Sequence, residues 1–210
     1  MKIKTLFTLA IVLSSNFSVF SADRQAGQAK AAMCIACHNM DGNSAIPIYP
    51  KLAGQHQSYL EKQLREYRAA AFSGGKKGRN NPIMNAMAVG LSDEDIVNIA
   101  AYYSTNKVSP LPEESEFDKN LFNKGKQLYL GGDKKRHVTA CSACHGPLGK
   151  GLGSAKFPSL VQQHPAYIKE QLKNFRSRTR HNDLNGMMRM ASKQLTNEDI
   201  EALVVYIKNI

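Results

Sequence analysis

The sequence predicts an all-α protein built from two tandem domains that are related by an internal repeat. Three observations support this prediction. A Cys-x-x-Cys-His pentapeptide occurs twice, 107 residues apart; apolar residues recur at helical spacing in both halves; and no useful length of chain alternates apolar and polar residues as a strand would. Without its first 22 residues the chain retains about 188, which suits two domains of about 90 residues each.

The first 22 residues have the features of a signal peptide. Lys2 and Lys4 form a positive start, Leu6 to Leu13 form a short apolar core, and Ser21 and Ala22 offer a cleavage site. The apolar run is well short of the roughly 20 residues that span a bilayer. We therefore expect export to the periplasm with cleavage near Ser21/Ala22, rather than a retained membrane anchor.

The repeated pentapeptide is the strongest chemical signal in the chain. Cys34-Ile35-Ala36-Cys37-His38 is the first copy and Cys141-Ser142-Ala143-Cys144-His145 is the second. This pattern is typical of c-type haem attachment, in which two cysteine sulfurs form thioethers and the histidine binds the iron. The two copies use every cysteine of the chain, and they predict two covalently bound haem c groups.

Other uses of four cysteines fit the spacing less well. A redox-active pair calls for a βαβ setting, a four-cysteine zinc site calls for halves roughly 15–20 residues apart, and two disulfides would allow three connectivities. None of these explains why a histidine follows the second cysteine in both copies. The cysteine pattern therefore favours haem over metal or disulfide chemistry.

The repeat extends well beyond the haem motifs. A proline loop and a middle helix recur at an offset of 108, and a C-terminal helix recurs at an offset of 104, so the intervening loop is shorter in the second half. Ser92 and Thr196, each with an acid three residues later, are natural helix N-caps. The matched segments are Tyr49-Pro50-Lys51-Leu52 with Phe157-Pro158-Ser159-Leu160, Gln55-His56 with Gln163-His164, and Leu91 to Ile96 with Leu195 to Ile200.

The sixth iron ligand decides between electron transfer and catalysis, because substrate activation needs a vacant site. Met84 and Met188 each lie eight residues before a cap, in what we expect to be loops, and a thioether ligand raises the reduction potential. These two methionines are the predicted ligands opposite His38 and His145. The rival histidines at positions 56 and 164 are expected at the surface or at helix starts.

The roles of the two loop prolines and of the basic loops before the methionines each remain open. The carbonyl of Pro50 or Pro158 either accepts the second N–H of a ligand histidine or belongs to an ordinary loop. Arg68 and Arg176 match across the repeat and are candidates to pair with a haem propionate. The remaining cations before the methionines, Lys76, Lys77, Arg79, Arg178 and Arg180, have the pattern of a solvated surface.

With these motifs the chain resembles the cytochrome c4 family, the periplasmic dihaem members of the class I cytochromes c. The resemblance covers essentially the whole mature chain and rests on both pentapeptides, on Pro50-Lys-Leu52 and Pro158-Ser-Leu160, and on the Met84 and Met188 segments. It implies two class I cytochrome c domains related by a pseudo-twofold axis, with His/Met iron and propionate edges that approach one another. The expected division is a signal peptide at 1–22, an N-terminal domain at 23–107, a linker at 108–116 and a C-terminal domain at 117–210.

The resemblance also implies an electron carrier rather than an enzyme. Its expected partners are membrane respiratory complexes and a terminal haem-copper oxidase. The protein itself is expected to be a monomer with loose peripheral membrane association. Two alternatives are the cytochrome subunit of a flavocytochrome c sulfide dehydrogenase and a dihaem peroxidase. The formal charge of +11 suits an acidic partner, whereas nucleic-acid binding would want aromatics among the basic residues.

Overall fold

The computed structural model describes residues 21–112 and 116–210. All but the last two residues of the predicted signal peptide, and residues 113–115 of the predicted linker, lie outside the described residues. Within the described ranges the chain is helical, and two isolated bridges, Asp133–Val138 and Leu152–Phe157, take the place of strands. No helix in these ranges is both long and apolar enough to cross a bilayer.

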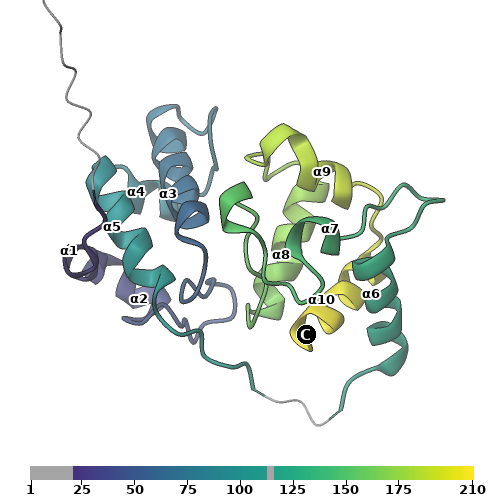
Figure 1. The fold of residues 1–210 in the computed structure, drawn as a ribbon. Coiled ribbons are helices and arrows are strands. Elements are labelled where there is room, and N and C mark those ends of the chain that lie inside the picture. Colours follow the sequence, from purple (N-terminus) through teal and green to yellow (C-terminus); the bar gives the residue numbers. More distant parts are fainter. Residues whose placement is uncertain (1–20, 113–115) are drawn as a thin grey trace, which may run out of the picture.

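The two halves of the chain form two helical bodies side by side (Figure 1). Each half runs from an N-terminal helix through a short helix with the haem motif to a middle helix, a short helix and a C-terminal helix. The first half consists of α1 (Arg24–Lys30), η1 (Ala31–Cys34), α2 (Ile35–His38), α3 (Gln57–Phe72), α4 (Pro82–Ala88) and α5 (Asp93–Ser104). The second half consists of α6 (Lys119–Gly131), α7 (Ser142–His145), η2 (Gly153–Ala155), α8 (Pro165–Arg176), η3 (Leu184–Gly186), α9 (Met187–Ser192) and α10 (Asn197–Lys208).

The predicted caps of the C-terminal helices are confirmed. The hydroxyl of Ser92 accepts the N–H of Asp95, whose carboxylate accepts the N–H of Ser92 in return. Thr196 and Asp199 form the same capping box at the start of α10. Each box satisfies helix N–H groups that would otherwise lack a partner, which explains why both helices begin at equivalent places.

The N-terminal and C-terminal helices of each half cross at a glycine. A Cβ placed on Gly27 would lie 2.0 Å from the carbonyl oxygen of Asn98 in α5. A Cβ on Gly125 would lie equally close to the carbonyl oxygen of Ala202 in α10. Only a residue without a side chain permits this approach, so the same close crossing is built into both halves.

Each half has its own hydrophobic core. In the first half, Cys34 and Met84 pack against a buried cluster centred on α5 residues such as Ile96 and Tyr103. In the second half, Cys141 and Met188 pack against a cluster built largely from α10. Two separate cores, each holding one haem motif and one candidate methionine, are what tandem domains require.

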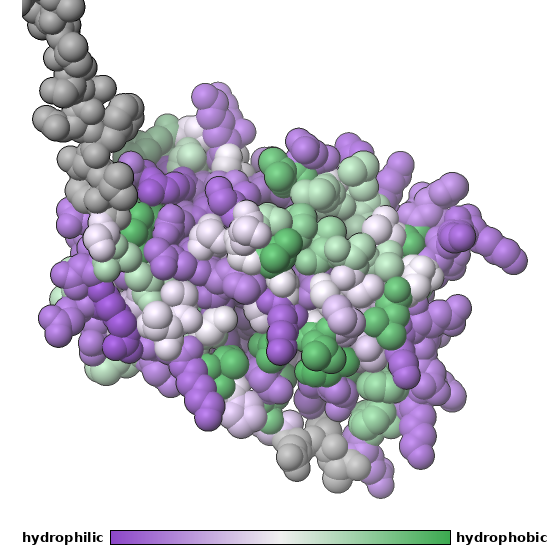
Figure 2. All heavy atoms as spheres, viewed as in Figure 1, coloured by the Kyte–Doolittle hydropathy of each residue, from purple (hydrophilic) through white to green (hydrophobic). Residues whose placement is uncertain are grey.

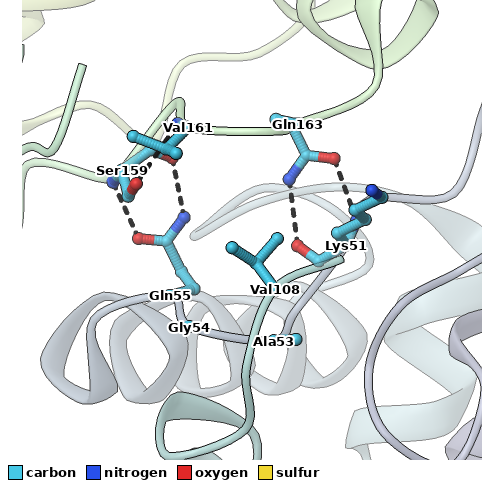
Figure 3. A pocket seen from close by; sticks show the side chains of 8 residues that line it. All are labelled: Lys51, Ala53, Gly54, Gln55, Val108, Ser159, Val161 and Gln163. Carbon is cyan, nitrogen blue, oxygen red and sulfur yellow. Dashed lines mark hydrogen bonds between the residues drawn. The ribbon is translucent and has the colours of Figure 1, made fainter. Parts of the chain in front are cut away.

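Glutamine side chains join the two halves through two symmetric pairs of hydrogen bonds (Figure 3). The amide of Gln163 accepts the backbone N–H of Lys51 and donates to its carbonyl, both at 2.9 Å. Gln55 makes the same two bonds, also at 2.9 Å, with the backbone of Ser159. The cavity left between the pairs has about 20 Å³, room for about one water. The halves therefore meet in a tightly packed, twofold-like interface.

The repeated histidines also lie at this interface. His56 and His164 begin α3 and α8, as expected, but His164 is buried rather than at the surface. The Nε2 atoms of the two rings lie 2.8 Å from the carbonyl oxygens of Lys150 and Ser44, each in the opposite half. Both imidazoles are therefore used to hold the halves together.

The start of the predicted linker is held against the first half. Lys51 donates through Nζ to the carbonyl of Ser109, and the N–H of Ser109 bonds to the side chain of Asn43 at 2.7 Å. The N–H of Leu111 bonds to the Gln162 side chain. The segment thus passes over both halves close to where they meet.

Candidate haem sites

Each haem motif is carried by short helical turns, and its first cysteine packs against the core of its own half. Cys34 ends η1 and Cys37 lies in α2, so the two thiols project from neighbouring turns; Cys141 and Cys144 are arranged alike around α7. All four thiols are free and half-buried. The two pairs belong to different halves, and no cluster of three or more His, Cys, Asp or Glu ligands occurs in the parts of the chain described, so the four cysteines do not form one zinc site there.

The histidines of the two motifs, which are the candidate iron ligands, are buried and bonded to the proline carbonyls. The Nδ1 of His38 lies 2.9 Å from the carbonyl oxygen of Pro50, and the Nδ1 of His145 lies 2.9 Å from that of Pro158. A carbonyl only accepts, so Nδ1 carries the proton and Nε2 keeps its lone pair for a metal. Of the two roles open for these prolines, the structure shows the one in which the carbonyl accepts the N–H of the motif histidine.

A short backbone bond brings each proline beneath its histidine. The N–H of Leu52 donates to the carbonyl of Gly42 at 2.7 Å, and the N–H of Leu160 donates to that of Gly149 at the same distance. Gly42 adopts φ +83°, and a Cβ there would lie 2.7 Å from the ring of Tyr103. The glycine is therefore required for the turn that closes the loop.

Burial sets the protonation of these side chains. It lowers the pKa of His38 and of His145 despite the opposing bonds to the proline carbonyls, so both rings stay neutral, the form that binds metal. Burial raises the pKa of Cys34 and raises that of Cys141 to about 11. These thiols are not the exposed, low-pKa kind found in redox catalysis.

Met84 lies on helix α4 and not in a loop, so the expected loop is wrong. Pro82 at the first helical position and Asn81 as N-cap start this helix, and the Asn81 side chain accepts the N–H of Met84 at 2.9 Å. Pro and Asn are strong helix-start signals, but seven residues are too few to show a helical period. The half-buried Met84 packs on the core, whereas Met87 is exposed on the same helix.

Met188 likewise lies on a short helix, α9, instead of the expected loop. Asn185 and Gly186 have φ of 51° and 72°, so the chain reverses just before the helix begins. The hydroxyl of the fully buried Ser192 donates to the carbonyl of Met188 at 2.7 Å. Met188 packs on the second core, while Met190 points away and is 62% exposed. The two candidate methionines are therefore equivalently placed.

Arg68 and Arg176, the candidates to pair with a propionate, make equivalent bonds in the two halves. Arg68 donates to the carbonyl of Leu91 at 2.6 Å and pairs with Asp93, and Arg176 donates to the carbonyl of Leu195 at 2.8 Å and to Asn197. Both arginines thus fasten the middle helix to the start of the C-terminal helix.

Two cations expected at a solvated surface are instead buried. Arg79 is 8% exposed and Arg180 is 9% exposed, whereas Lys76, Lys77 and Arg178 are exposed as expected. Charged side chains are rarely buried without a specific partner, so specific partners are expected around these two guanidiniums.

The residues present fit a haem in each half. The hydroxyl of Tyr103 is buried in the cluster that includes Cys34 and has no hydrogen-bond partner in the described chain, which indicates a pocket that protein atoms do not complete. Figure 2 shows hydrophobic patches over the second half within a largely hydrophilic surface. Exposed apolar side chains there include Leu148, Leu152 and Leu184, as suits an apolar macrocycle or a docking surface.

Several interface residues were missed by the sequence analysis. The sequence shows Gln55 and Gln163 only as repeat matches and predicts Arg79 and Arg180 at the surface, whereas the structure places all four where the halves meet. The signal was present, because a Gln-His pair recurring at the same offset as the proline loop implies a shared role. The spacing of apolar residues along the sequence cannot reveal hydrogen bonds from a side chain to the backbone of another domain.

Comparison with known proteins agrees with this geometry. The cytochrome c family model matches residues 25–107 and 122–210. Cytochrome c4 of Thiocapsa roseopersicina is 44% identical over 190 residues, covering 90% of this chain and 93% of the relative. A thiosulfate dehydrogenase electron acceptor of Stutzerimonas stutzeri (strain A1501) is 35% identical over 89% of this chain and 83% of its own length.

A solved structure has the same fold over nearly the whole molecule. Reduced recombinant cytochrome c4 from Pseudomonas stutzeri superposes with a TM-score of 0.82 at 42% identity, covering 90% of this chain and 98% of that chain. Two tandem domains of the class I cytochrome c fold are thereby confirmed. The protein has two haem c groups, and its Cys-x-x-Cys-His cysteines stand at 34/37 and 141/144. The chain belongs to the cytochrome c4 family of dihaem cytochromes c.

Proposed function

We propose that this dihaem electron-transfer protein passes single electrons between membrane respiratory complexes and a terminal haem-copper oxidase in the periplasm, as a monomer with loose peripheral membrane association. The two haem c groups supply the chemistry, since iron that alternates between its ferric and ferrous states takes up and releases one electron. The protein is a carrier, as its family is, and not a peroxidase.

His/Met ligation in both halves is the central part of this proposal. Cys34, Cys37 and His38 would hold the first haem with Met84, and Cys141, Cys144 and His145 would hold the second with Met188. The observation that carries it is that Met84 and Met188 pack on the same cores as Cys34 and Cys141. A filled sixth position limits rearrangement on oxidation and leaves no site for substrate.

An absorption measurement tests the ligation. The ferric protein should show the weak band near the red edge of the visible that Met-ligated ferric haem gives. Replacing Met84 with Ala and, separately, Met188 with Ala should each remove about half of its intensity, while Met87→Ala should leave the band unchanged. A full-strength band in either ligand variant would contradict the assignment for that half.

Charge distribution supports an acidic redox partner at the second half. Residues 117–210 carry 16 Lys and Arg against 7 Asp and Glu, whereas residues 23–107 carry 10 against 7. An open, basic hollow of about 250 Å³ lies on this half between Arg178, Arg189 and Lys193. Electron transfer to a purified terminal oxidase should therefore slow as salt rises, because screening weakens such steering.

A second candidate function concerns the electron donor. The relative named as a thiosulfate dehydrogenase electron acceptor favours a sulfur-compound dehydrogenase as the donor, in place of a membrane complex or the flavoprotein of a flavocytochrome c sulfide dehydrogenase. Stopped-flow mixing of the oxidised protein with each reduced donor separates these possibilities. Fastest reduction by the sulfur-compound dehydrogenase at physiological salt would support this second candidate, and fastest reduction by a membrane complex would contradict it.

A further inference from the structure

The buried guanidiniums of Arg79 and Arg180 occupy equivalent places where the two halves meet. Arg79 donates to Gln63 of its own half at 2.8 Å, and across the interface to the hydroxyl of Tyr167 at 3.0 Å and to Gln171 at 2.8 Å. Each arginine is therefore held by both domains. The matching bonds of Arg180 go to Gln171 in its own half and to Tyr59 and Gln63 in the other.

Neither arginine has a carboxylate partner among the described residues. Their bonds go to neutral amide and hydroxyl oxygens, and no ion pair there includes them. Glu66, which accepts a bond from Asn182 beside Arg180, is already paired with Lys62. Two buried positive charges thus remain uncompensated, and a buried charge without a counter-charge is costly.

The tyrosines of this cluster show the same lack of an acceptor. Tyr59 and Tyr167 each accept a bond from the arginine of the opposite half, and neither hydroxyl donates to any described group. The bonds of Arg79 all come from its two terminal nitrogens, which leaves its Nε–H free as well. Unused N–H and O–H donors beside two positive charges have the character of an anion site.

Electrostatics at Tyr59 agrees with this positive environment. Burial alone would raise the pKa of its hydroxyl, yet the charges of Arg180 and Arg79 hold that pKa below its ordinary value. The local field thus favours negative charge at this position in the interface.

Both arginines stack on a buried aromatic ring of the middle helix in their own half, and that of Arg79 belongs to a haem-binding core. The guanidinium of Arg79 lies 4.9 Å from the ring centre of Tyr67, which is buried in the cluster that packs against Cys34 and Met84. The guanidinium of Arg180 lies 4.4 Å from the ring of Phe175, the residue at the matching place on α8. The carboxylates that each haem brings, its propionates, are the anions available beside these cores.

We propose that Arg79, Arg180, Tyr59 and Tyr167 form one carboxylate-binding site, shared by the two domains, that holds haem propionates of both halves. The site rests on haem attachment, which family membership shows, and not on the identity of the sixth ligands. Because each arginine is bonded to both domains, its charge acts on both irons. A fixed positive charge stabilises the reduced state, so it raises the reduction potential.

Redox titration of the full-length holoprotein tests the proposal. Arg79→Gln and Arg180→Gln should each lower the reduction potentials of both haems, while Lys77→Gln and Arg178→Gln, exposed cations of the same two loops, should change neither by a comparable amount. A shift confined to one haem, or a shift no larger than in these controls, would overturn the shared site.

Two further measurements separate charge from structure and propionate from solute. Arg79→Lys and Arg180→Lys keep the charge and should keep both potentials near those of the native protein, even if they loosen the interface. A fall as large as in the Gln variants would mean that packing, not charge, is responsible. Added inorganic phosphate at constant ionic strength should leave the native potentials unchanged, whereas a concentration-dependent shift would show that a solution anion fills the site.

Discussion

The side-chain amide of Gln163 and the backbone of Lys51 satisfy each other completely across the domain interface, with two hydrogen bonds of 2.9 Å. The same arrangement recurs between Gln55 and Ser159. A glutamine that pairs with both backbone polar groups of one residue fixes position as well as orientation. These two pairs set how the haem-binding halves face each other.

Removing one such amide should loosen the interface. Gln163→Ala leaves the buried N–H and carbonyl of Lys51 without partners, so we expect a loss of about 1–3 kcal/mol in the free energy of unfolding. The double variant with Gln55→Ala should lose more and unfold in two steps, one for each domain. Denaturant unfolding followed by circular dichroism measures both effects.

Gln57→Ala is the matched control, because the Gln57 side chain bonds to Glu61 on its own helix and to no residue of the other half among those described. It should stay within about 0.5 kcal/mol of the native protein. If Gln163→Ala behaved like this control, the amide pairs would not hold the domains together.

The glycine crossing predicts a position-specific cost within one helix. Gly125→Ala would place a Cβ 2.0 Å from the carbonyl oxygen of Ala202, so α6 must move away from α10. We expect a loss of about 3 kcal/mol, at the high end for overpacking. Gly131→Ala at the end of the same helix meets nothing within 4 Å. Thermal unfolding should separate the two clearly, and equal melting temperatures would mean that the crossing is not tightly packed.

Asp199 should give the protein an acid-sensitive component of stability. Burial acts to raise the pKa of this carboxyl, but Arg136, the backbone N–H and hydroxyl of Thr196, and Lys124 outweigh it and hold the pKa well below its usual range. A folded pKa below the unfolded value of about 3.9 stabilises the fold at higher pH. That contribution is complete above about pH 5 and is lost as the pH falls below about 4.

Asp199→Asn should remove this component. The variant should be less stable at neutral pH and should differ less from the native protein as the pH falls toward 3, as followed by unfolding in urea. Asp95→Asn, the same capping position in the first half, is the control. It has a single cationic partner, Lys30, and is more exposed, so its effect should be smaller. A constant difference between Asp199→Asn and the native protein across the pH range would contradict this account.

Local sequence signals predicted the elements that depend on local chemistry. The capping boxes at Ser92 and Thr196 fix where α5 and α10 begin, and apolar spacing identified α3 and α8. The sequence suggested the proline carbonyls as acceptors of a histidine N–H but did not decide it. The outcome depends on how the loop closes through the bond between Gly42 and Leu52.

Features that depend on contacts between distant segments could not be predicted in the same way. Helices α4 and α9 have seven and six residues, too few for a periodic pattern. Arg79 is bonded across the interface to Tyr167 and Gln171 of the other half, and its own segment carries no sign of that burial. Arg68 donates to the carbonyl of Leu91. Every residue has a backbone carbonyl, so the sequence does not reveal this partner.

Met84 and Met188 are the proposed sixth ligands of the two irons, and a redox titration of ligand variants is the sharpest test of that assignment. A thioether ligand gives a higher potential than an imidazole. Met84→His should therefore lower the potential of one haem and Met188→His that of the other, while Met87→His and Met190→His on the exposed faces of the same helices change neither. If neither ligand variant lowers a potential, or if both lower the same one, the assignment of the methionines is contradicted.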